Sequence, residues 1–543
     1  MKKLWIIALM AIMTMCLAAF TGCGDSDHSA GEDSGVKATC SNGVMIGQEE
    51  NGVASYLGIP YAKPPVGELR WKAPVAAEDS DEEIVCDHFG YTPLQYEWPT
   101  EPASYEEKSE DCLTLNVWTS TEESDTPKSV MFWIHGGSNA WGGTADPIYN
   151  GQKFVEAHPD IVLVTTNYRL GMMSWADFSK IPGGEEYTDI NLGLRDQICA
   201  LEWVQKNIEA FGGNPDEVTI FGESAGAGNV SALMVSPMAE GLFNKVIAES
   251  GTFTYLSGTR EEAQEFAATI AKATGCKTMD ELLALSEEEL LAADTEYSLG
   301  DESCGVVYDG VVMPNEEDVP DAVAAAADRG IKLMHGATAD EMNYFMVDAW
   351  GETKEEKFAD WKSGLDATWN EFAEADAESK NLLDQFYQIR ESMVPEEYAS
   401  DAEVKEALIE SALPTELFRE SHIQLSDMFS DAGGEAYMYY WGVPSTSDDY
   451  FKSACHAIEL CYVFNNTEDT IYSGDNPDEA TAEKTHTAWA NFAKTGNPSQ
   501  DGIEWTAYNS KDKNMMDIEL SGWEMKNDPT KDQRVIIEKL LGE

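Results

Sequence analysis

Short apolar runs alternate with amphipathic stretches along this sequence from about residue 40 onward. Several runs have the length and the β-branched or aromatic content of buried strands: SVMFWIHGG, DIVLVTTNYRL, EVTIFG, NKVIAESG, GIKLMHGAT and EAYMYYWGV. Between them, apolar residues recur at helical spacing, most clearly at Leu194, Ile198, Leu201, Val204 and Ile208. Strands that alternate with helices predict an α/β fold built on a large, mostly parallel sheet.

Two longer regions, roughly 260–300 and 355–430, are acidic and mostly helical in pattern. We expect them to be insertions that cap the sheet. A chain of 543 residues would by length alone suggest three or four domains. However, no internal repeat and no Pro- or Ser-rich linker divides the chain after the N-terminal segment, and the candidate site described below draws on residues far apart. We therefore predict one domain over residues 39–543.

The N-terminus begins MKKLWIIALMAIMTMCLAAFTGC, with two lysines before an apolar run that is short for a membrane span. This pattern predicts an export signal over residues 1–22. FTGC resembles a bacterial lipobox, so Cys23 is the expected lipid-attachment site, and the polar residues 23–38 form a flexible tether. These features predict a lipoprotein tethered to the outer face of a bacterial membrane. Phe20 is unusual in a lipobox, which leaves simple cleavage and secretion, or a retained anchor, as alternatives.

Composition narrows the possible partners. Formal net charge is −64, from 99 acidic and 35 basic residues, and such a surface repels phosphates, so we expect no nucleic-acid partner. The ten cysteines include no C-x-x-C pair, and no His/Cys cluster has zinc-site spacing, so no metal and no cofactor is expected. Export would permit disulfides.

The most informative short motif is FGESAGAGNVS at 221–231. An apolar strand-like run precedes it and a helix start rich in small residues follows, which is the setting of a G-x-S-x-G nucleophile elbow. Gly222 and Gly226 would let backbone segments approach closely while the turn exposes the Ser224 hydroxyl. The alternative is a Gly/Ser-rich helix entry without chemistry.

A serine nucleophile needs a histidine base that is oriented by a carboxylate, and in the elbow architecture these follow in the order Ser, acid, His. His422 and His486 lie in amphipathic helical patterns and His335 lies in a predicted strand, which leaves His456 as the best candidate. The acid should follow a late strand, where Asp340 and Glu341 are neighbours. The pattern alone does not separate these two carboxylates.

Hydrolysis of an ester also requires N–H donors for the oxyanion of the tetrahedral intermediate. The residue after the nucleophile, Ala225, supplies one such N–H. The glycine-rich segment WIHGGSNAWGG at 133–143 follows an early predicted strand and is positioned to supply others. Taken together, the elbow, loop, acid and base predict a serine hydrolase.

The chain resembles the type-B carboxylesterase family, the cholinesterase-like α/β-hydrolases. The matching segments are LGIPYAKPPVGELRWKAP, EDCLTLNVW, WIHGG, NYRLG and NLGLRDQICALEWVQKNIEAFGGNPDEVTIFGESAGA, spread over most of residues 40–500. The resemblance implies an α/β-hydrolase fold, a triad of Ser224, Glu341 and His456, oxyanion N–H groups from Gly137, Ser138 and Ala225, and a disulfide between Cys86 and Cys112.

The sequence departs from the family pattern at a few positions. Ser138 stands where a third glycine is usual, and Asn139 stands where an aromatic residue is usual, which predicts a stiffer loop and a more polar pocket. Met342 replaces the usual glycine after the acid. The usual partner of Cys276 is missing, and Cys304 is the remaining possibility.

The leading hypothesis is an esterase that hydrolyses neutral small to medium carboxylic esters through an acyl-serine intermediate. One alternative is a non-catalytic cholinesterase-like binding or adhesion protein, which the presence of all three triad residues opposes. Another is a lipase or sterol esterase, which the acidic surface disfavours because anionic lipid would repel it.

Overall fold

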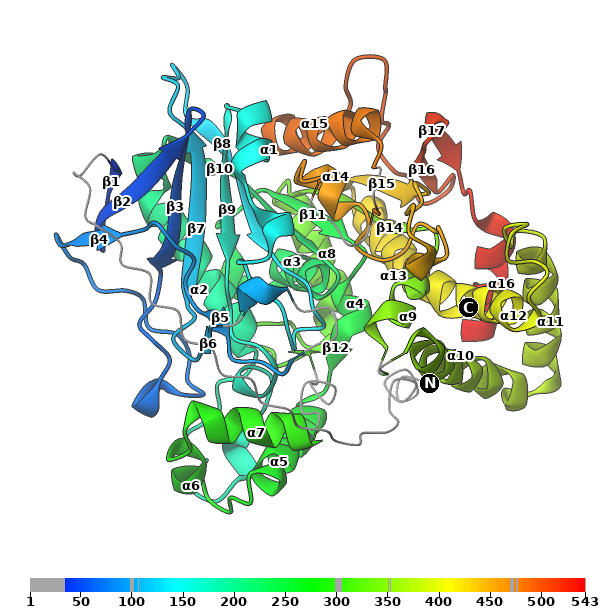
Figure 1. The fold of residues 1–543 in the computed structure, drawn as a ribbon, viewed down its shortest axis with the longest axis horizontal. Coiled ribbons are helices and arrows are strands. Elements are labelled where there is room, and N and C mark those ends of the chain that lie inside the picture. Colours follow the sequence, from blue (N-terminus) through cyan, green and yellow to red (C-terminus); the bar gives the residue numbers. More distant parts are fainter. Residues whose placement is uncertain are drawn as a thin grey trace.

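The computed structural model describes residues 35–97, 102–105, 107–297, 305–349, 351, 353–468, 473–474 and 477–542 (Figure 1). The predicted signal segment 1–22, the expected lipid-attachment residue Cys23 and the possible disulfide residue Cys304 lie outside the described residues.

A single large sheet organises the fold, with strand order β1-β2-β3-β7-β9-β8-β10-β11-β14-β15-β16-β17 and with β4 paired to β2 (Figure 1). Within the run β9-β8-β10-β11-β14-β15-β16 every adjacent pair is parallel. The pairs β1-β2, β2-β3, β3-β7, β7-β9 and β16-β17 are antiparallel, and β4 lies parallel to β2. Every predicted strand is present and belongs to the parallel part. The strands are β1 (Val36–Cys40), β2 (Gly43–Glu50), β3 (Val53–Pro60), β4 (Glu83–Val85), β5 (Thr92–Pro93), β6 (Lys108–Ser109), β7 (Thr114–Ser120), β8 (Lys128–Ile134), β9 (Ile161–Thr166), β10 (Gly213–Glu223), β11 (Lys245–Glu249), β12 (Ser257–Gly258), β13 (Val306–Val307), β14 (Lys332–Thr338), β15 (Glu435–Trp441), β16 (Asn514–Glu519) and β17 (Gly522–Asn527).

Helices cover both faces of this sheet, which explains why its central strands are apolar along their whole length. On β8, Phe132 points to one face and Trp133 to the other, because successive strand side chains alternate. The first face packs against α2, α3, α8 and α13, and the second against α1, α14 and α15. The helices are α1 (Gln152–Ala157), α2 (Leu192–Asn207), α3 (Ala225–Val235), α4 (Phe253–Leu256), α5 (Arg260–Ala273), α6 (Met279–Leu283), α7 (Glu287–Tyr297), α8 (Val319–Asp328), α9 (Phe345–Asp348), α10 (Lys354–Ala375), α11 (Ala377–Glu391), α12 (Ala402–Glu410), α13 (Ala412–Asp431), α14 (Leu460–Val463), α15 (Glu479–Thr495) and α16 (Lys531–Leu541).

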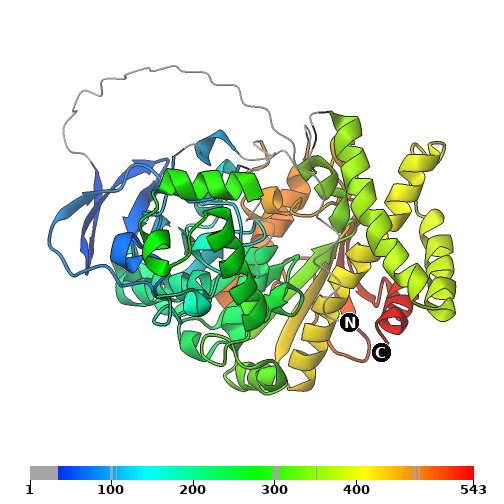
Figure 2. The same ribbon diagram turned by 90° about the horizontal axis from the view of Figure 1, so that it is seen from below.

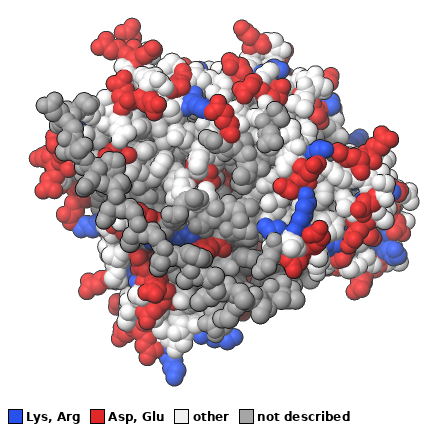
Figure 3. Space-filling view, viewed as in Figure 1, with Lys and Arg blue, Asp and Glu red and all other residues white. Residues whose placement is uncertain are grey.

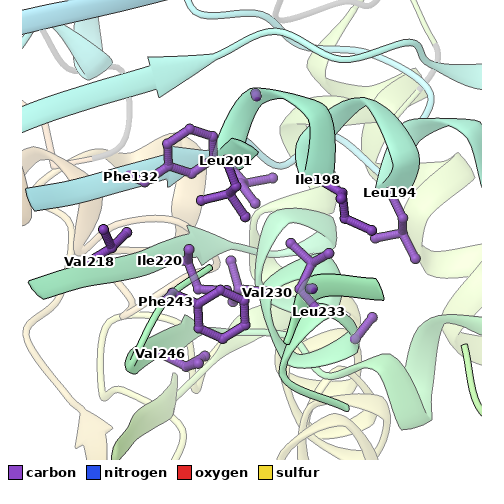
Figure 4. Packing of buried hydrophobic residues seen from close by; sticks show 14 of the residues in the cluster. Phe132, Leu194, Ile198, Leu201, Val218, Ile220, Val230, Leu233, Phe243 and Val246 are labelled. Atoms are coloured by element: carbon purple, nitrogen blue, oxygen red, sulfur yellow. The ribbon is translucent and has the colours of Figure 1, made fainter. Parts of the chain in front are cut away.

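The core beneath the predicted nucleophile is formed by α2 and α3 lying over β8, β10 and β11 (Figure 4). Leu201 of α2 lies near Phe132, and Val230 of α3 packs beside Ile220 and Phe243, all fully or almost fully buried. The apolar periodicity of 191–208 thus corresponds to the buried face of α2. This packing fixes the start of α3 relative to the ends of β8 and β10.

The two acidic regions are helical as predicted, but they cover different parts of the molecule. Helices α5–α7 pack with loop residues such as Trp71, Met172 and Phe178, so they cover loops rather than the sheet. In the second region α13 packs on the sheet, while α11 and α13 enclose a separate apolar cluster with the C-terminal helix α16. Figure 2 shows this C-terminal helix, in red, beside the yellow-green helices of the second region.

Acidic side chains outnumber basic ones on the face shown in Figure 3 and are spread around it. None of the helices in the described ranges is both long enough and apolar enough to cross a membrane.

The structure contradicts the disulfide predicted between Cys86 and Cys112, because both are buried free thiols. The Cys86 sulfur lies 3.8 Å from Met45 Sδ and 3.5 Å from the Ile84 carbonyl oxygen, between β2 and β4. Around Cys112, by comparison, the nearby charged groups are Asp196, Arg169 and Asp111. Both cysteines belong to the large apolar core, and neither is bridged. Burial raises the pKa of the Cys86 thiol to about 12, so it stays protonated and unreactive at neutral pH.

Candidate active site

Ser224 occupies a sharp turn between β10 and α3. Its backbone has φ 57° and ψ −123°, a strained conformation for a residue with a Cβ. Its N–H donates to the Glu249 carbonyl oxygen over 2.8 Å, which ties the turn to the end of the neighbouring strand β11. The residue is partly exposed although the residues on either side of it are buried. This is the strand–turn–helix setting that the motif predicts.

Glycines around the turn allow backbone contacts that no other residue would permit. A Cβ at Gly226 would lie 2.1 Å from the Ile134 carbonyl oxygen, and one at Gly222 would lie 2.6 Å from the same oxygen. A Cβ at Gly251 would lie 2.1 Å from the Ser224 carbonyl oxygen. Real Cβ atoms do not approach backbone this closely, so these positions require glycine.

Glu341 and His456 lie in direct contact. His456 Nδ1 is 2.5 Å from Glu341 Oε2, and the His456 N–H also donates to the Glu341 carbonyl oxygen over 3.2 Å. A carboxylate that accepts from Nδ1 leaves Nε2 as the ring nitrogen available to a nucleophile. Asp340 instead faces away, with its Oδ1 3.1 Å from Arg390 Nη2. Of the two neighbouring carboxylates left open by the sequence, the structure brings Glu341 to the histidine.

The Glu341 carboxylate is completely buried and has two further donors. Its Oε1 accepts the Thr338 N–H over 2.6 Å and the Ser250 hydroxyl over 2.8 Å. The Ser250 hydroxyl oxygen also lies 3.3 Å from Glu459 Oε1. With His456 on its other oxygen, the carboxylate is held in one orientation by donors from separate segments.

A second carboxylate approaches His456 from the other side. Glu223 Oε1 is 3.0 Å from His456 Nε2, although Glu223 Oε1 has no hydrogen-bond partner among the described residues, so the contact is an ion pair without hydrogen-bond geometry. No hydrogen bond joins Ser224 Oγ to His456 within the part of the chain that the structure describes. Such catalytic bonds are commonly long in enzymes without substrate. Glu223 directly precedes Ser224 in the sequence, but nothing in the sequence pattern predicts that its carboxylate contacts His456.

The carboxylates dominate the electrostatics of the site. Burial lowers the pKa of His456, but the charges of Glu223 and Glu341 outweigh this effect and raise it from 6.5 to about 9. Burial raises the pKa of Glu223 to about 8 and that of Glu459 to about 7, and it raises that of Glu249 well above 4.5. Carboxyl groups this close together cannot all ionise in a buried site, so protons are shared among them near neutral pH.

The predicted oxyanion donors lie on two adjoining segments. Gly137 and Ser138 follow β8, with φ of 98° and 54°, and Ala225 is the first residue of α3. None of their three N–H groups donates a hydrogen bond to any described residue. A Cβ at the preceding Gly136 would lie 3.0 Å from the Ser224 Cβ, so the loop directly contacts the serine turn. Unused N–H groups beside an exposed serine are what an oxyanion hole requires.

Asn139 differs from expectation, because its side chain does not add polarity to an open pocket. It is 2% exposed and its amide faces α3, whereas the neighbouring Ser138 is exposed. The polar side chain at position 139 therefore forms its hydrogen bonds in the protein interior and does not line the pocket.

Aromatic rings surround the remaining side of the histidine. The ring centroids of Phe345, Tyr344 and Phe418 lie 5.6 Å, 6.0 Å and 6.0 Å from that of His456. These rings exclude water from the imidazole and strengthen its interactions with the carboxylates.

Four other histidines form two pairs with each other. His335 and His422 are buried and lie 3.3 Å apart at their Nδ1 atoms, and His158 Nε2 lies 2.8 Å from His486 Nδ1. Burial lowers the pKa of His335 to about 3 and is the main reason that of His158 falls to about 3, so these rings are neutral. In the described residues, no group of three or more His, Cys, Asp or Glu side chains could hold a metal ion.

Comparison with known proteins agrees with this geometry. A family model described as the carboxylesterase family matches residues 34–536. The chain is 33% identical to a para-nitrobenzyl esterase of Bacillus subtilis over 528 residues, covering 91% of this chain and 97% of that protein. It is 30% identical to a liver carboxylesterase of Sus scrofa, covering 94% of this chain and 92% of that protein.

Solved structures show the same likeness. A carboxylesterase of Geobacillus stearothermophilus superposes with a TM-score of 0.75 at 30% identity, and a thermophilic PNB esterase with a TM-score of 0.74 at 31% identity. Each comparison covers 92% of this chain and 99% of the other. The similarity thus extends over the sheet, the helical insertions and the site.

Proposed function

The chain belongs to the carboxylesterase family and is a carboxylic ester hydrolase, and from this premise we propose that Ser224, Glu341 and His456 are its catalytic triad. The observation that carries the proposal is the contact between Glu341 and His456. It forms beside the strained turn where Ser224 is partly exposed between buried neighbours.

In the proposed mechanism, His456 Nε2 accepts the Ser224 hydroxyl proton as Oγ attacks the ester carbonyl carbon. Glu341 holds the Nδ1 proton in place and stabilises the imidazolium that forms. The C=O π pair moves to the carbonyl oxygen, which becomes an oxyanion facing the N–H groups of Gly137, Ser138 and Ala225.

Collapse of this tetrahedral intermediate breaks the bond to the alkoxy oxygen, which leaves as the alcohol with the proton from His456. The acyl-serine remains. Water then attacks the acyl carbon while His456 accepts its proton, and the acid product leaves as Ser224 regains its hydrogen.

The overall charge of the chain bears on substrate choice. The formal net charge is −64, so an acidic substrate would meet repulsion at long range. We therefore assign neutral carboxylic esters of small to medium size as substrates, in agreement with relatives named para-nitrobenzyl esterase and liver carboxylesterase.

The proposed cellular location rests on the sequence of residues 1–38. A basic start, a short apolar run and Cys23 in a lipobox-like setting favour export and attachment of lipid at that cysteine. The polar residues after Cys23 would act as a tether between the membrane and the esterase.

A fluorophosphonate should label Ser224 once per chain and abolish hydrolysis of a short-chain p-nitrophenyl ester, because the turn presents one activated hydroxyl. Ser224→Ala should remain folded by circular dichroism and lose at least about 10³-fold in kcat. Ser231 is a buried serine on the same helix α3, so intact labelling in Ser231→Ala is the matched control. Labelling that survives in Ser224→Ala would contradict the assignment of the nucleophile.

Replacing the two neighbouring carboxylates should give opposite results. Glu341→Gln removes the acceptor for His456 Nδ1–H, and analogous losses reach roughly 10⁴-fold in kcat, or about 5 kcal/mol of transition-state stabilisation. Asp340→Asn should cost about tenfold or less, because Asp340 only faces Arg390. Both are measured with an aryl ester at saturating concentration. A severe loss in Asp340→Asn with near-normal Glu341→Gln would reject Glu341 as the acid.

The pH dependence should reflect the raised pKa of His456. A base with a raised pKa remains protonated, and therefore inactive, to a higher pH. We expect kcat/KM to rise with pH through a midpoint above 6.5, toward the value of about 9 for His456. In Glu223→Gln one negative charge beside the ring is lost, which should lower the midpoint by about 1 pH unit or more. An unchanged midpoint would show that Glu223 does not act on the base.

Cys23→Ala should move the protein from membrane to soluble fractions or leave it unprocessed when it is expressed in a bacterium that lipidates exported proteins. The measurement is fractionation together with intact mass, and wild type should be heavier than its cleaved chain by the attached lipid. Unchanged mass and membrane retention in Cys23→Ala would favour an uncleaved N-terminal anchor instead.

A further inference from the structure

Two buried asparagines exchange hydrogen bonds directly beside the candidate oxyanion donors. Asn229 Nδ2 donates to Asn139 Oδ1 over 2.8 Å, and Asn139 Nδ2 donates to Asn229 Oδ1 over 3.4 Å. Asn229 is 0% exposed and Asn139 is 2% exposed. Bulk water cannot reach either amide to form hydrogen bonds in place of the partner. Breaking the pair would therefore leave polar groups buried and without hydrogen bonds.

The pair joins the two segments that supply the N–H groups. Asn139 follows Gly137 and Ser138 on the loop after β8. Asn229 lies four residues after Ala225 on α3, which places the two on the same face of the helix. The amide pair thus bridges from one side of the donor set to the other.

Further bonds hold Asn139 in place from behind. The Tyr168 hydroxyl lies 3.3 Å from Asn139 Oδ1 and 2.8 Å from the His135 carbonyl oxygen. The Asn139 carbonyl oxygen accepts the Trp175 indole N–H over 3.0 Å and the Gly171 N–H over 2.8 Å. Side-chain and backbone groups of Asn139 are therefore both fixed.

The loop needs such support because its backbone is strained. Ser138 and Asn139 both have positive φ, 54° and 57°, a region that is unfavourable for residues with a Cβ. Asparagine tolerates this region better than most side chains. Strained conformations persist where surrounding contacts over-determine them, and the asparagine pair supplies such contacts.

We propose that Asn139 and Asn229 form a positioning pair that sets the spacing between the N–H donors of Gly137 and Ser138 and the N–H donor of Ala225. This inference rests on the proposed function of these N–H groups. An oxyanion is stabilised when donors lie about 2.7–3.1 Å from it, and a misplacement of about 1 Å can cost 10²-fold in rate. Loss of the pair weakens transition-state binding while ground-state binding of the ester is largely kept.

The test uses Asn139→Gly, Asn229→Ser and the double variant in the full chain. Glycine accepts the positive φ at 139, and serine is small enough for the buried position on α3, so these replacements remove the amide bonds with little new strain. Kinetics with a short-chain p-nitrophenyl ester are combined with the inhibition constant of a trifluoromethyl ketone, whose adduct with a serine places an oxyanion at the donors.

Each single variant should lose about 10- to 100-fold in kcat, with KM changed less than threefold. The inhibition constant of the ketone should rise in parallel with the loss in kcat/KM. The double variant should lose about as much as the worse single variant, because either change breaks the same pair. Circular dichroism and melting temperature establish that the variants are folded at the assay temperature.

Asn509→Ala is the matched control. Asn509 Nδ2 donates to Asn514 Oδ1 over 2.8 Å in an amide pair of the C-terminal region, and that variant should lose stability without loss of kcat. If the folded Asn139→Gly and Asn229→Ser variants keep kcat within twofold, or if their losses multiply in the double variant, the positioning role is rejected. If Asn139→Gly does not fold, Asn229→Ser alone decides by the same two measurements.

Wild type and Ser224→Ala are assayed in parallel. Failure of wild type to hydrolyse the ester would overturn the proposed function. Normal wild type with unaffected asparagine variants would overturn only the positioning pair.

Discussion

The close approach of the Ile134 carbonyl oxygen to the start of α3 is the constraint on which the active-site geometry depends. Gly222 and Gly226 face this oxygen from the end of β10 and from the first turn of α3. Since Ile134 is the last residue of β8, the contact also fixes where the following loop begins. Nucleophile and oxyanion loop are thus positioned by one backbone packing arrangement, and the large buried core beneath it keeps that arrangement rigid (Figure 4).

Charge, rather than packing, governs the other half of the site. His456 lies between Glu341 and Glu223, with Glu459 and Glu249 behind them, all buried. A neutral imidazole is needed for attack, yet the carboxylates favour the charged ring. The same carboxylates stabilise the imidazolium that forms in the transition state. The site therefore has less neutral His456 at low pH, but it stabilises the positive charge that develops during the reaction.

Much of this could be predicted from the sequence, and the reasons differ between elements. Six strands of the parallel sheet (β8, β9, β10, β11, β14 and β15) and helix α2 were predictable because burial on both faces, or on one helical face, leaves a recognisable apolar pattern, whereas β16 was not predicted. The surroundings of Ser224 were predictable because close backbone contacts demand glycine at fixed spacing. His456 followed from the order of residues along an elbow fold, and Glu341 from the resemblance to the family.

Other features leave no local pattern. Glu223 contacts His456, and Asn229 pairs with Asn139, only because segments distant in the chain meet, so neither role could be read from its neighbours. The disulfide between Cys86 and Cys112 was implied by the resemblance to the family alone, and it is wrong here because both residues are buried free thiols. Asn139 was expected to make the pocket more polar because an aromatic residue is usual there in the family, but its amide is buried and pairs with Asn229 of α3.

The position of His456 after β15 also has a consequence for how the chain acquires its activity. β15 pairs with β14, and the main chain of His456 bonds to that of Glu341, so base and acid meet only when these two strands have joined. Ser224, by contrast, belongs to strands that are complete much earlier in synthesis. During synthesis the nucleophile is therefore made well before the base. A chain that ends before β15 would carry the serine turn without its base, so turnover requires the sheet to be extended and paired as far as β15.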